Sequence, residues 1–182
     1  MTLSFMQHWK SGKNKGKPTF FVDKIWSSFD EYTFLACFDT FSIPHKEKVG
    51  RYIESNKKAK SHSIRFGKRQ WIAGNDIHFA INNRTKNYFR FAPITEVVSV
   101  QKIEFELIGG LTEDAQSYDI MNVFIDEKNF GSFDRLKKEV IFGEDNLQQL
   151  AINDGFESVE DFFEYFNENA TGQLIHWTDL TY

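Results

Sequence analysis

Residues 56–90 read NKKAKSHSIRFGKRQWIAGNDIHFAINNRTKNYFR, and they carry the clearest strand and turn signals of the chain. Polar and apolar residues alternate over 61–65 and again over 76–81, as they do in strands with one buried face. Turn-forming pairs, Gly74-Asn75 and Asn82-Asn83, flank the second run. The stretch therefore predicts short strands joined by tight turns.

The rest of the chain adds further strands and a few helices. The side-chain parity changes within 94–108, which predicts a bulge near Gln101-Lys102. Many short strands with peripheral helices favour the α+β class, in the form of a small mixed β-barrel. Strands are expected over 3–6, 88–91, 94–108, 118–126 and 173–178, and helices over 18–29, over 145–153 and from Ser158 onward.

Length and composition indicate a single domain over 1–182. The 182 residues are 41% hydrophobic and include 20 Phe, enough for an aromatic-rich core. Cys37 is the sole cysteine, so no disulfide forms within the chain and a reducing cytoplasm is the expected location. No apolar run approaches the roughly 18 residues that span a bilayer, so we expect neither a membrane segment nor a signal peptide.

Charge is distributed unevenly along the chain, although the net charge is only −4. Residues 1–102 hold 18 Lys and Arg against 8 Asp and Glu, whereas 103–182 hold 4 against 18. From Ile141 onward there is no Lys or Arg. This separation predicts a basic face and an acidic face, or two halves that interleave and neutralise each other.

The basic cluster within 56–90 combines nine Lys and Arg with a single acid, Asp76. Cations bind phosphate and flat rings stack on bases, a combination typical of nucleotide and single-strand recognition. The alternative is that the cluster is a solvent-exposed strand face whose lysines only make the protein soluble. The candidate phosphate ligands are Arg65, Arg69, Arg84 and Lys86, and the candidate base-stacking residues are Trp71 and His78.

Lys60-Ser61-His62-Ser63-Ile64-Arg65 is the most specific part of this cluster. A Lys near a hydroxyl forms a nucleophile pair if burial lowers the pKa of the amine enough for it to act as a base. Most Lys and Ser neighbours are surface residues, which is the alternative. The five histidines show no ligand spacing and no glycine-rich phosphate loop is present, so we expect no metal and no cofactor.

The same hexapeptide resembles the signature of ASCH domains, relatives of the PUA fold, in which Lys and two further residues precede Thr-Ile-Arg. The similarity is greatest to a subgroup from phages and Bacteroides-type bacteria. The similarity does not extend to residues 30–55, which we interpret as an insertion, or to about 127–143, which we interpret as a variable loop. Other segments similar to the family follow in order at 69–79, 84–86, 99–103, 153–156, 161–163 and 175–179.

The resemblance implies a small barrel with a cleft that binds RNA or a nucleotide. Some small bacterial members of the family remove the acetyl group from 4-acetylcytidine with a Lys, a Thr and a Glu. Lys60 matches the Lys, Ser63 matches the Thr, and Asp154 is the nearest match to the Glu. The resemblance makes these three the candidate catalytic residues, with two departures from the family pattern.

Three hypotheses for the function follow. The first is a module that binds RNA or a modified nucleoside or nucleotide in a basic cleft. The second is an amidohydrolase that acts on 4-acetylcytidine or a similar acylated nucleoside. The third is a protein-interaction factor, whose partner docks on the acidic face formed after Ile141.

Overall fold

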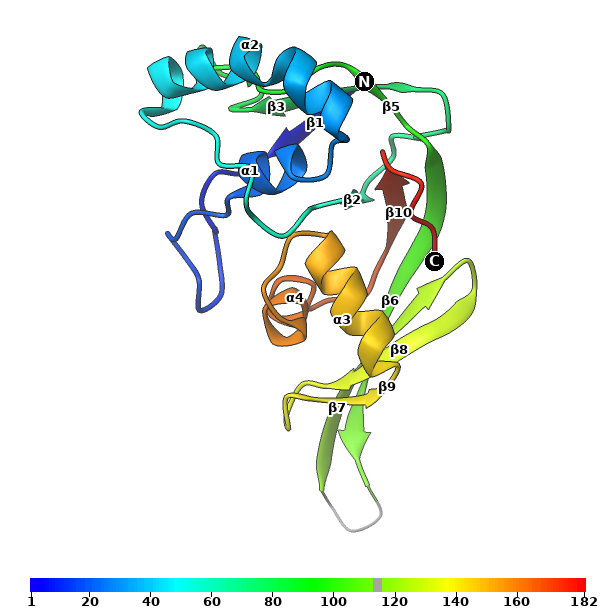
Figure 1. Ribbon diagram of the computed structural model, residues 1–182. Coiled ribbons are helices and arrows are strands. Elements are labelled where there is room, and N and C mark those ends of the chain that lie inside the picture. Colours follow the sequence, from blue (N-terminus) through cyan, green and yellow to red (C-terminus); the bar gives the residue numbers. More distant parts are fainter. Residues whose placement is uncertain (113–115) are drawn as a thin grey trace.

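The computed structural model describes residues 1–112 and 116–182 as an α+β fold with two sheets (Figure 1). In the smaller sheet, β1 runs parallel to β3, and β3 pairs antiparallel with both β4 and β5. Its strands are β1 (Thr2–Phe5), β3 (Asp76–Ile81), β4 (Phe89–Arg90) and β5 (Thr95–Glu96).

The larger sheet is antiparallel, with the strand order β2-β10-β6-β7-β8-β9. Strands β2 and β9 stand at its two ends, and no pairing among the described residues joins them. The α+β class is therefore confirmed, whereas the closed barrel is not detected in the described part of the chain. The strands are β2 (His62–Phe66), β6 (Ser99–Leu111), β7 (Ser117–Ile125), β8 (Lys128–Asp134), β9 (Glu139–Phe142) and β10 (Ala170–His176).

Four helices accompany the sheets: α1 (Phe21–Trp26), α2 (Glu31–Val49), α3 (Glu144–Asn153) and α4 (Val159–Tyr165). Helix α1 is shorter than the expected 18–29 because Pro18 forms a β-bridge with His8 and Phe20 has a left-handed backbone, with φ of 54°. The 30–55 segment, expected to be only partly helical, contains the 19-residue α2. Asp30 caps α2 by accepting a hydrogen bond from the Thr33 amide at 2.7 Å.

Two further expectations are corrected by the strand register. The expected strand over 94–108 is split into β5 and β6, and the pairing of β6 with β10 is continuous through Gln101 and Lys102, so no bulge lies there. The apparent parity change arises because Val98 and Val100 are on the less buried side of the chain. The segment 127–143, expected to be a loop, contains the hairpin of β8 and β9.

The hydrophobic core is divided into two clusters. One contains Phe5, Ile25 and Phe79, and it lies between the smaller sheet and the helices α1 and α2. The other contains Phe105 and Phe162, and it lies between the larger sheet and the helices α3 and α4. Figure 1 shows this division, with α1 and α2 beside β1 and β3, and α3 beside the larger sheet. The candidate site lies between these two halves of the fold, each formed by one sheet, its helices and its core cluster.

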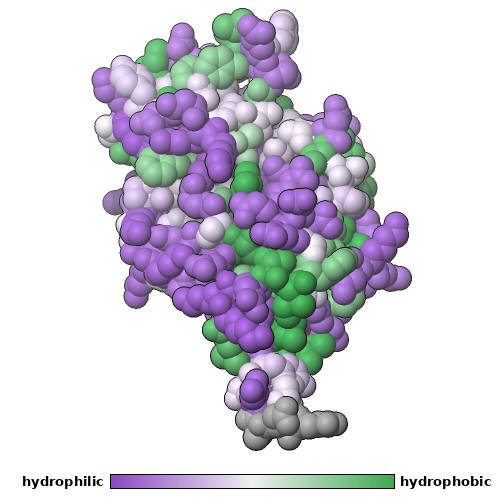
Figure 2. All heavy atoms as spheres, turned by 60° about the horizontal axis from the view of Figure 1, so that its bottom comes forward, coloured by the Kyte–Doolittle hydropathy of each residue, from purple (hydrophilic) through white to green (hydrophobic). Residues whose placement is uncertain are grey.

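The surface is mixed in polarity. Figure 2 shows polar side chains over much of one face and an apolar area toward the tip where β6 ends and β7 begins. None of the helices in the described ranges is long and apolar enough to cross a membrane. Exposed apolar side chains on β6, on β9 and in the turn between β8 and β9 include Ile108, Leu111, Leu136, Ile141 and Phe142.

The two oppositely charged halves of the sequence interleave. Lys24 Nζ lies 2.5 Å from Glu157 Oε1, and Lys13 Nζ lies 3.1 Å from Asp161 Oδ1. The Lys60–Asp154 pair joins the same two halves. These pairs compensate part of the acidic segment after Ile141, which leaves less free negative charge for a protein partner than the sequence suggested.

Candidate functional site

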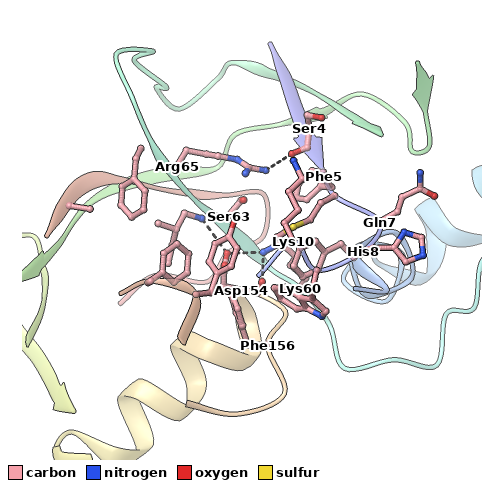
Figure 3. A pocket seen from close by; sticks show the side chains of 18 of the residues that line it. Ser4, Phe5, Gln7, His8, Lys10, Lys60, Ser63, Arg65, Asp154 and Phe156 are labelled. Atoms are coloured by element: carbon pink, nitrogen blue, oxygen red, sulfur yellow. Dashed lines mark hydrogen bonds and ion pairs between the residues drawn. The ribbon is translucent and has the colours of Figure 1, made fainter. Parts of the chain in front are cut away.

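A cavity of about 930 Å³ lies between the end of β1, the strand β2 and the segment that follows α4 (Figure 3). Its lining mixes cations, amides and aromatic rings. The residues are Ser4–Lys10, Phe21, Lys60, Ser63–Phe66, Asn82, Asn83, Asp154, Phe156 and Tyr165–Ala170.

Lys60 lies at the inner wall of this cavity and is only 2% exposed. Its Nζ donates to Asp154 Oδ1 at 2.7 Å and also to the backbone oxygen of Asp154. The same Nζ lies 4.9 Å from the ring centroid of Phe21, which adds a cation–π contact. The ammonium group is therefore held among aromatic rings with one charged partner.

Asp154 is placed by the end of α3, where it is the C-cap residue. Gly155 follows with φ of 91°, a left-handed conformation that glycine adopts without strain. Asp154 Oδ1 also accepts a hydrogen bond from the backbone N–H of Ile64 at 3.2 Å. The turn after α3 thus binds to β2, and Lys60 provides the positive charge that the C-terminal end of a helix favours.

The electrostatics of the pair depend on its burial. Burial lowers the pKa of Lys60 to about 8, although the charge of Asp154 acts in the opposite direction. Burial raises the pKa of Asp154, but the neighbouring Lys60 and His62 side chains together hold the pKa below its usual value. At neutral pH the pair is therefore ionised, and the amine loses its proton close to physiological pH.

Ser63 and Arg65 line the same cavity as Lys60 and Asp154. Ser63 is 3% exposed. Arg65 Nη2 donates to Ser4 O at 2.9 Å, and its guanidinium carbon lies 5.0 Å from the ring centroid of Phe5. The structure thus brings together four residues that the sequence singled out.

Aromatic rings and amides form the remaining walls. Phe66 and Tyr165 are 45% and 39% exposed, so their rings are accessible at the cavity. Trp9 packs edge-to-face on Phe21, with ring centroids 5.3 Å apart. Side-chain amides from Gln7, Asn82, Asn83, Asn167 and Asn169 offer both donors and acceptors.

The other predicted binding residues are not among those that line the cavity. Trp71, expected to stack on a base, is 3% exposed and belongs to the core cluster of the smaller sheet. His78 is part of β3, where it pairs with Thr2 of β1. Arg69 is exposed and donates to Thr2 O at 3.3 Å. Arg84 and Lys86 are exposed in the turn that follows Asn83.

Sequence reasoning missed the N-terminal wall of the cavity. Lys10 lines the cavity and begins the stretch KSGKNKGK, residues 10–17, which holds four lysines. Asn14 Nδ2 donates to Asp161 Oδ1 at 3.0 Å, which docks this loop on α4. A glycine-containing run of lysines next to Trp9 was the signal that could have identified this wall.

Metal ligation has no support from the geometry. No group of three or more His, Cys, Asp or Glu side chains that could hold a metal ion occurs within 1–112 and 116–182.

Comparisons of the chain with protein-family models, with curated proteins and with solved structures found no match. The cavity and its lining residues are therefore the features from which a function can be inferred.

Proposed function

We propose that this protein binds a nucleotide unit of RNA, or a modified nucleoside, in the cavity between its two halves. The observation that carries the proposal is the convergence of Lys60, Ser63, Arg65 and Asp154 on one cavity of about 930 Å³. That volume lies within the range of small-molecule sites. ASCH-like character remains a prediction from the hexapeptide at 60–65.

The chemistry of the walls matches such a ligand. Arg65 and Lys10 offer positive charge to a phosphate, and Phe66 and Tyr165 offer exposed ring faces or edges to a base. The amides of Asn82 and Asn83 can pair with the polar edge of a base, because an amide carries both a donor and an acceptor. Lys15 and Lys17, exposed in the same loop as Lys10, extend the positive charge beyond the cavity.

The test uses fluorescently labelled RNA nonamers of random sequence and fluorescence anisotropy. Binding is expected to weaken by about tenfold or more between about 50 mM and about 200 mM salt, because each neutralised phosphate releases counterions. Arg65→Met should weaken binding by a further tenfold or so, equivalent to about 1.4 kcal/mol. Arg69→Met is the matched control, because Arg69 lies outside the cavity lining.

Two results would overturn this function. Equal losses in Arg65→Met and Arg69→Met would show that binding depends on general surface charge and not on the cavity. Binding that ignores both salt and the Arg65 substitution would exclude phosphate recognition altogether. Free cytidine and 4-acetylcytidine, added as competitors, distinguish a nucleoside ligand from a polymer.

A second candidate function is the amidohydrolase, which is supported by the lowered pKa of Lys60, about 8, and by Ser63 in the same cavity. Neutral Lys60 would take the proton of the Ser63 hydroxyl as its oxygen attacks the acetyl carbonyl of 4-acetylcytidine. The cytidine amine would leave with that proton, aided by Asp154 as a proton carrier. Water would then release acetate from Ser63.

Release of cytidine from 4-acetylcytidine, followed by chromatography, tests this second candidate. The rate should rise as the pH increases toward about 8, because only the neutral amine acts as a base. Lys60→Met and Ser63→Ala should each abolish turnover, while Ser61→Ala, at a position outside the cavity lining, should not. Turnover absent from the wild type, or retained in Lys60→Met, excludes the hydrolase.

A further inference from the structure

A chain of buried polar groups lies directly behind the Lys60–Asp154 pair, on the side away from the cavity. His62 Nδ1 lies 3.5 Å from Asp154 Oδ1, and His62 is 0% exposed. On the other side of its ring, His62 Nε2 lies 2.9 Å from the Tyr182 hydroxyl oxygen. That hydroxyl oxygen also lies 3.0 Å from Asn153 Nδ2. None of His62, Tyr182 and Asn153 lines the cavity.

The direction of these hydrogen bonds follows from the chemistry of Asn153, the group farthest from Asp154 in the series. The Asn153 amide nitrogen can only donate, so the Tyr182 oxygen accepts from it and the Tyr182 O–H is free to donate to His62 Nε2. Burial lowers the pKa of His62 and raises the pKa of Tyr182, so both side chains are neutral. A neutral His62 that accepts at Nε2 carries its proton on Nδ1.

We propose that Tyr182 and His62 are positioning residues: Tyr182 fixes the Nδ1–H form of His62, and that N–H directs its positive end toward Asp154 Oδ1 beside Lys60. At 3.5 Å the N–H is too far for a full hydrogen bond, so it acts mainly as an oriented dipole. Asp154 Oδ1 then receives donors from Lys60 and from the Ile64 amide on one side, and the dipole of His62 on the other.

This arrangement affects the amine as well as the carboxylate. A positive dipole end near an ammonium group disfavours its charged form, so it acts in the same direction as burial on the pKa of Lys60. The charged groups that face Lys60 are Asp154, which favours the ammonium, and Arg65 and Lys24, which disfavour it. The neutral ring of His176, with its centroid 5.3 Å from that of His62, completes the surroundings.

The inference depends on the proposed function only in that Lys60 faces the ligand, and its test needs no ligand. The ¹⁵N signals of the His62 ring, measured in the full chain, distinguish the nitrogen that carries hydrogen from the one with a lone pair. The signals that are missing from the spectrum of His62→Gln are those of His62. The expected result for the wild type at neutral pH is a neutral ring with hydrogen on Nδ1. In Tyr182→Phe, which retains the ring and the backbone bonds to Gln101, the hydrogen should move partly or wholly to Nε2.

The Lys60 amine provides the second readout, because a role for Tyr182 in packing alone would not change it. The ¹⁵N signal of this amine is identified by its absence in Lys60→Met and is then followed in a pH titration. In Tyr182→Phe the positive dipole beside Asp154 is lost, which favours the ammonium form, so the acid dissociation constant of Lys60 should fall about threefold. Tyr118→Phe, in β7, is the control and should leave both readouts unchanged.

Three outcomes would overturn the inference: hydrogen on Nε2 in the wild type, a His62 form that does not respond to Tyr182→Phe, or an unchanged Lys60 titration. Each of these leaves the RNA-binding test unaffected. Conversely, loss of RNA binding would leave the ring measurements standing, so the failures of the two proposals are distinguishable.

Discussion

Two buried carboxylates, Asp23 and Asp154, each pair with a cation, but the Lys60–Asp154 pair lines the candidate cavity and the Arg51–Asp23 pair does not. Asp23 is 0% exposed, and both its oxygens accept from Arg51, at 2.7 and 2.6 Å. The Glu54 amide also donates to Asp23 at 2.7 Å. Asp154 is buried to a similar degree, but its partner Lys60 lines about 930 Å³ of open space.

The two pairs show that a buried charge indicates function only when it also borders an accessible cavity. The Asp23–Arg51 pair is saturated by its own hydrogen bonds and connects α1 to the segment after α2, so its role is structural. The Lys60–Asp154 pair also connects segments, since it joins the end of α3 to β2. It additionally presents an amine with a lowered pKa to an accessible cavity, which is typical of functional sites.

The largest effect is expected from Lys60→Met. It leaves Asp154 buried without its cation, which should lower the free energy of unfolding by about 3 kcal/mol and abolish RNA binding. Adding Asp154→Asn should restore most of the stability, because no unpaired buried charge remains, but it should not restore binding. Urea unfolding and anisotropy measure the two quantities, and binding by the double variant would show that Lys60 serves structure alone.

Arg51→Met should destabilise the fold by a comparable amount, about 3 kcal/mol, because Asp23 would lose the partner of both its oxygens. Unlike the Lys60 change, it should leave the affinity for RNA within about twofold of the wild type under conditions where the protein is folded. A tenfold loss of affinity in Arg51→Met would remove the contrast between the two pairs.

Each pair has a neighbouring glycine with a left-handed backbone, which allows a matched comparison. At Gly155, φ is 91° and an added Cβ would lie 2.8 Å from Phe21 Cε1 and 3.1 Å from Lys60 Cδ. At Gly50, φ is 88° and nothing lies within 4 Å. Gly155→Ala should therefore cost about 2 kcal/mol and weaken binding, while Gly50→Ala should cost about 1 kcal/mol. Equal costs in thermal unfolding would show that the turn after α3 is not tightly packed on Lys60.

The smallest effect concerns His176, a buried neighbour of the pair. Burial lowers the pKa of His176 to about 3, and both its ring nitrogens are without hydrogen-bond partners among the described residues. Below about pH 6.5 the unfolded chain binds a proton there that the folded chain does not, so stability falls as pH decreases. His176→Leu should reduce this loss by about 1 kcal/mol at about pH 6 and add stability at neutral pH. An unchanged pH profile of urea unfolding would contradict the burial of a neutral His176.

The sequence predicted the elements that have a clear period or cap. The runs 61–65 and 76–81 became β2 and β3, and 145–153 became α3, because alternation and helical spacing are local signals. Helix α2 was missed as a single helix, since Pro44 lies inside it and proline disfavours a helix interior. The closed barrel depended on pairing between distant strands, which local patterns do not determine.

The site was predicted in part for the same reason. Alternation puts Ser63 and Arg65 on one face of β2, but Lys60 and Ile64, on the other face by the same rule, line the cavity as well. Residue type alone could not separate Trp71 in the core from Trp9 at the cavity. Both are aromatic residues close to lysine and arginine in the sequence. Which of them reaches the cavity depends on how the two halves of the fold meet, and no local pattern records that.

The most direct test of the central claim follows the three methionine methyl groups by ¹³C NMR while an RNA pentanucleotide pool is added. Met6 lines the cavity, whereas Met121 is buried in the second core and Met1 lies outside the cavity lining. If the cavity holds a nucleotide, the Met6 signal shifts in a saturable way while the Met121 signal stays in place. Binding that leaves Met6 unmoved, or no binding at all, would contradict the claim that this cavity holds a nucleotide.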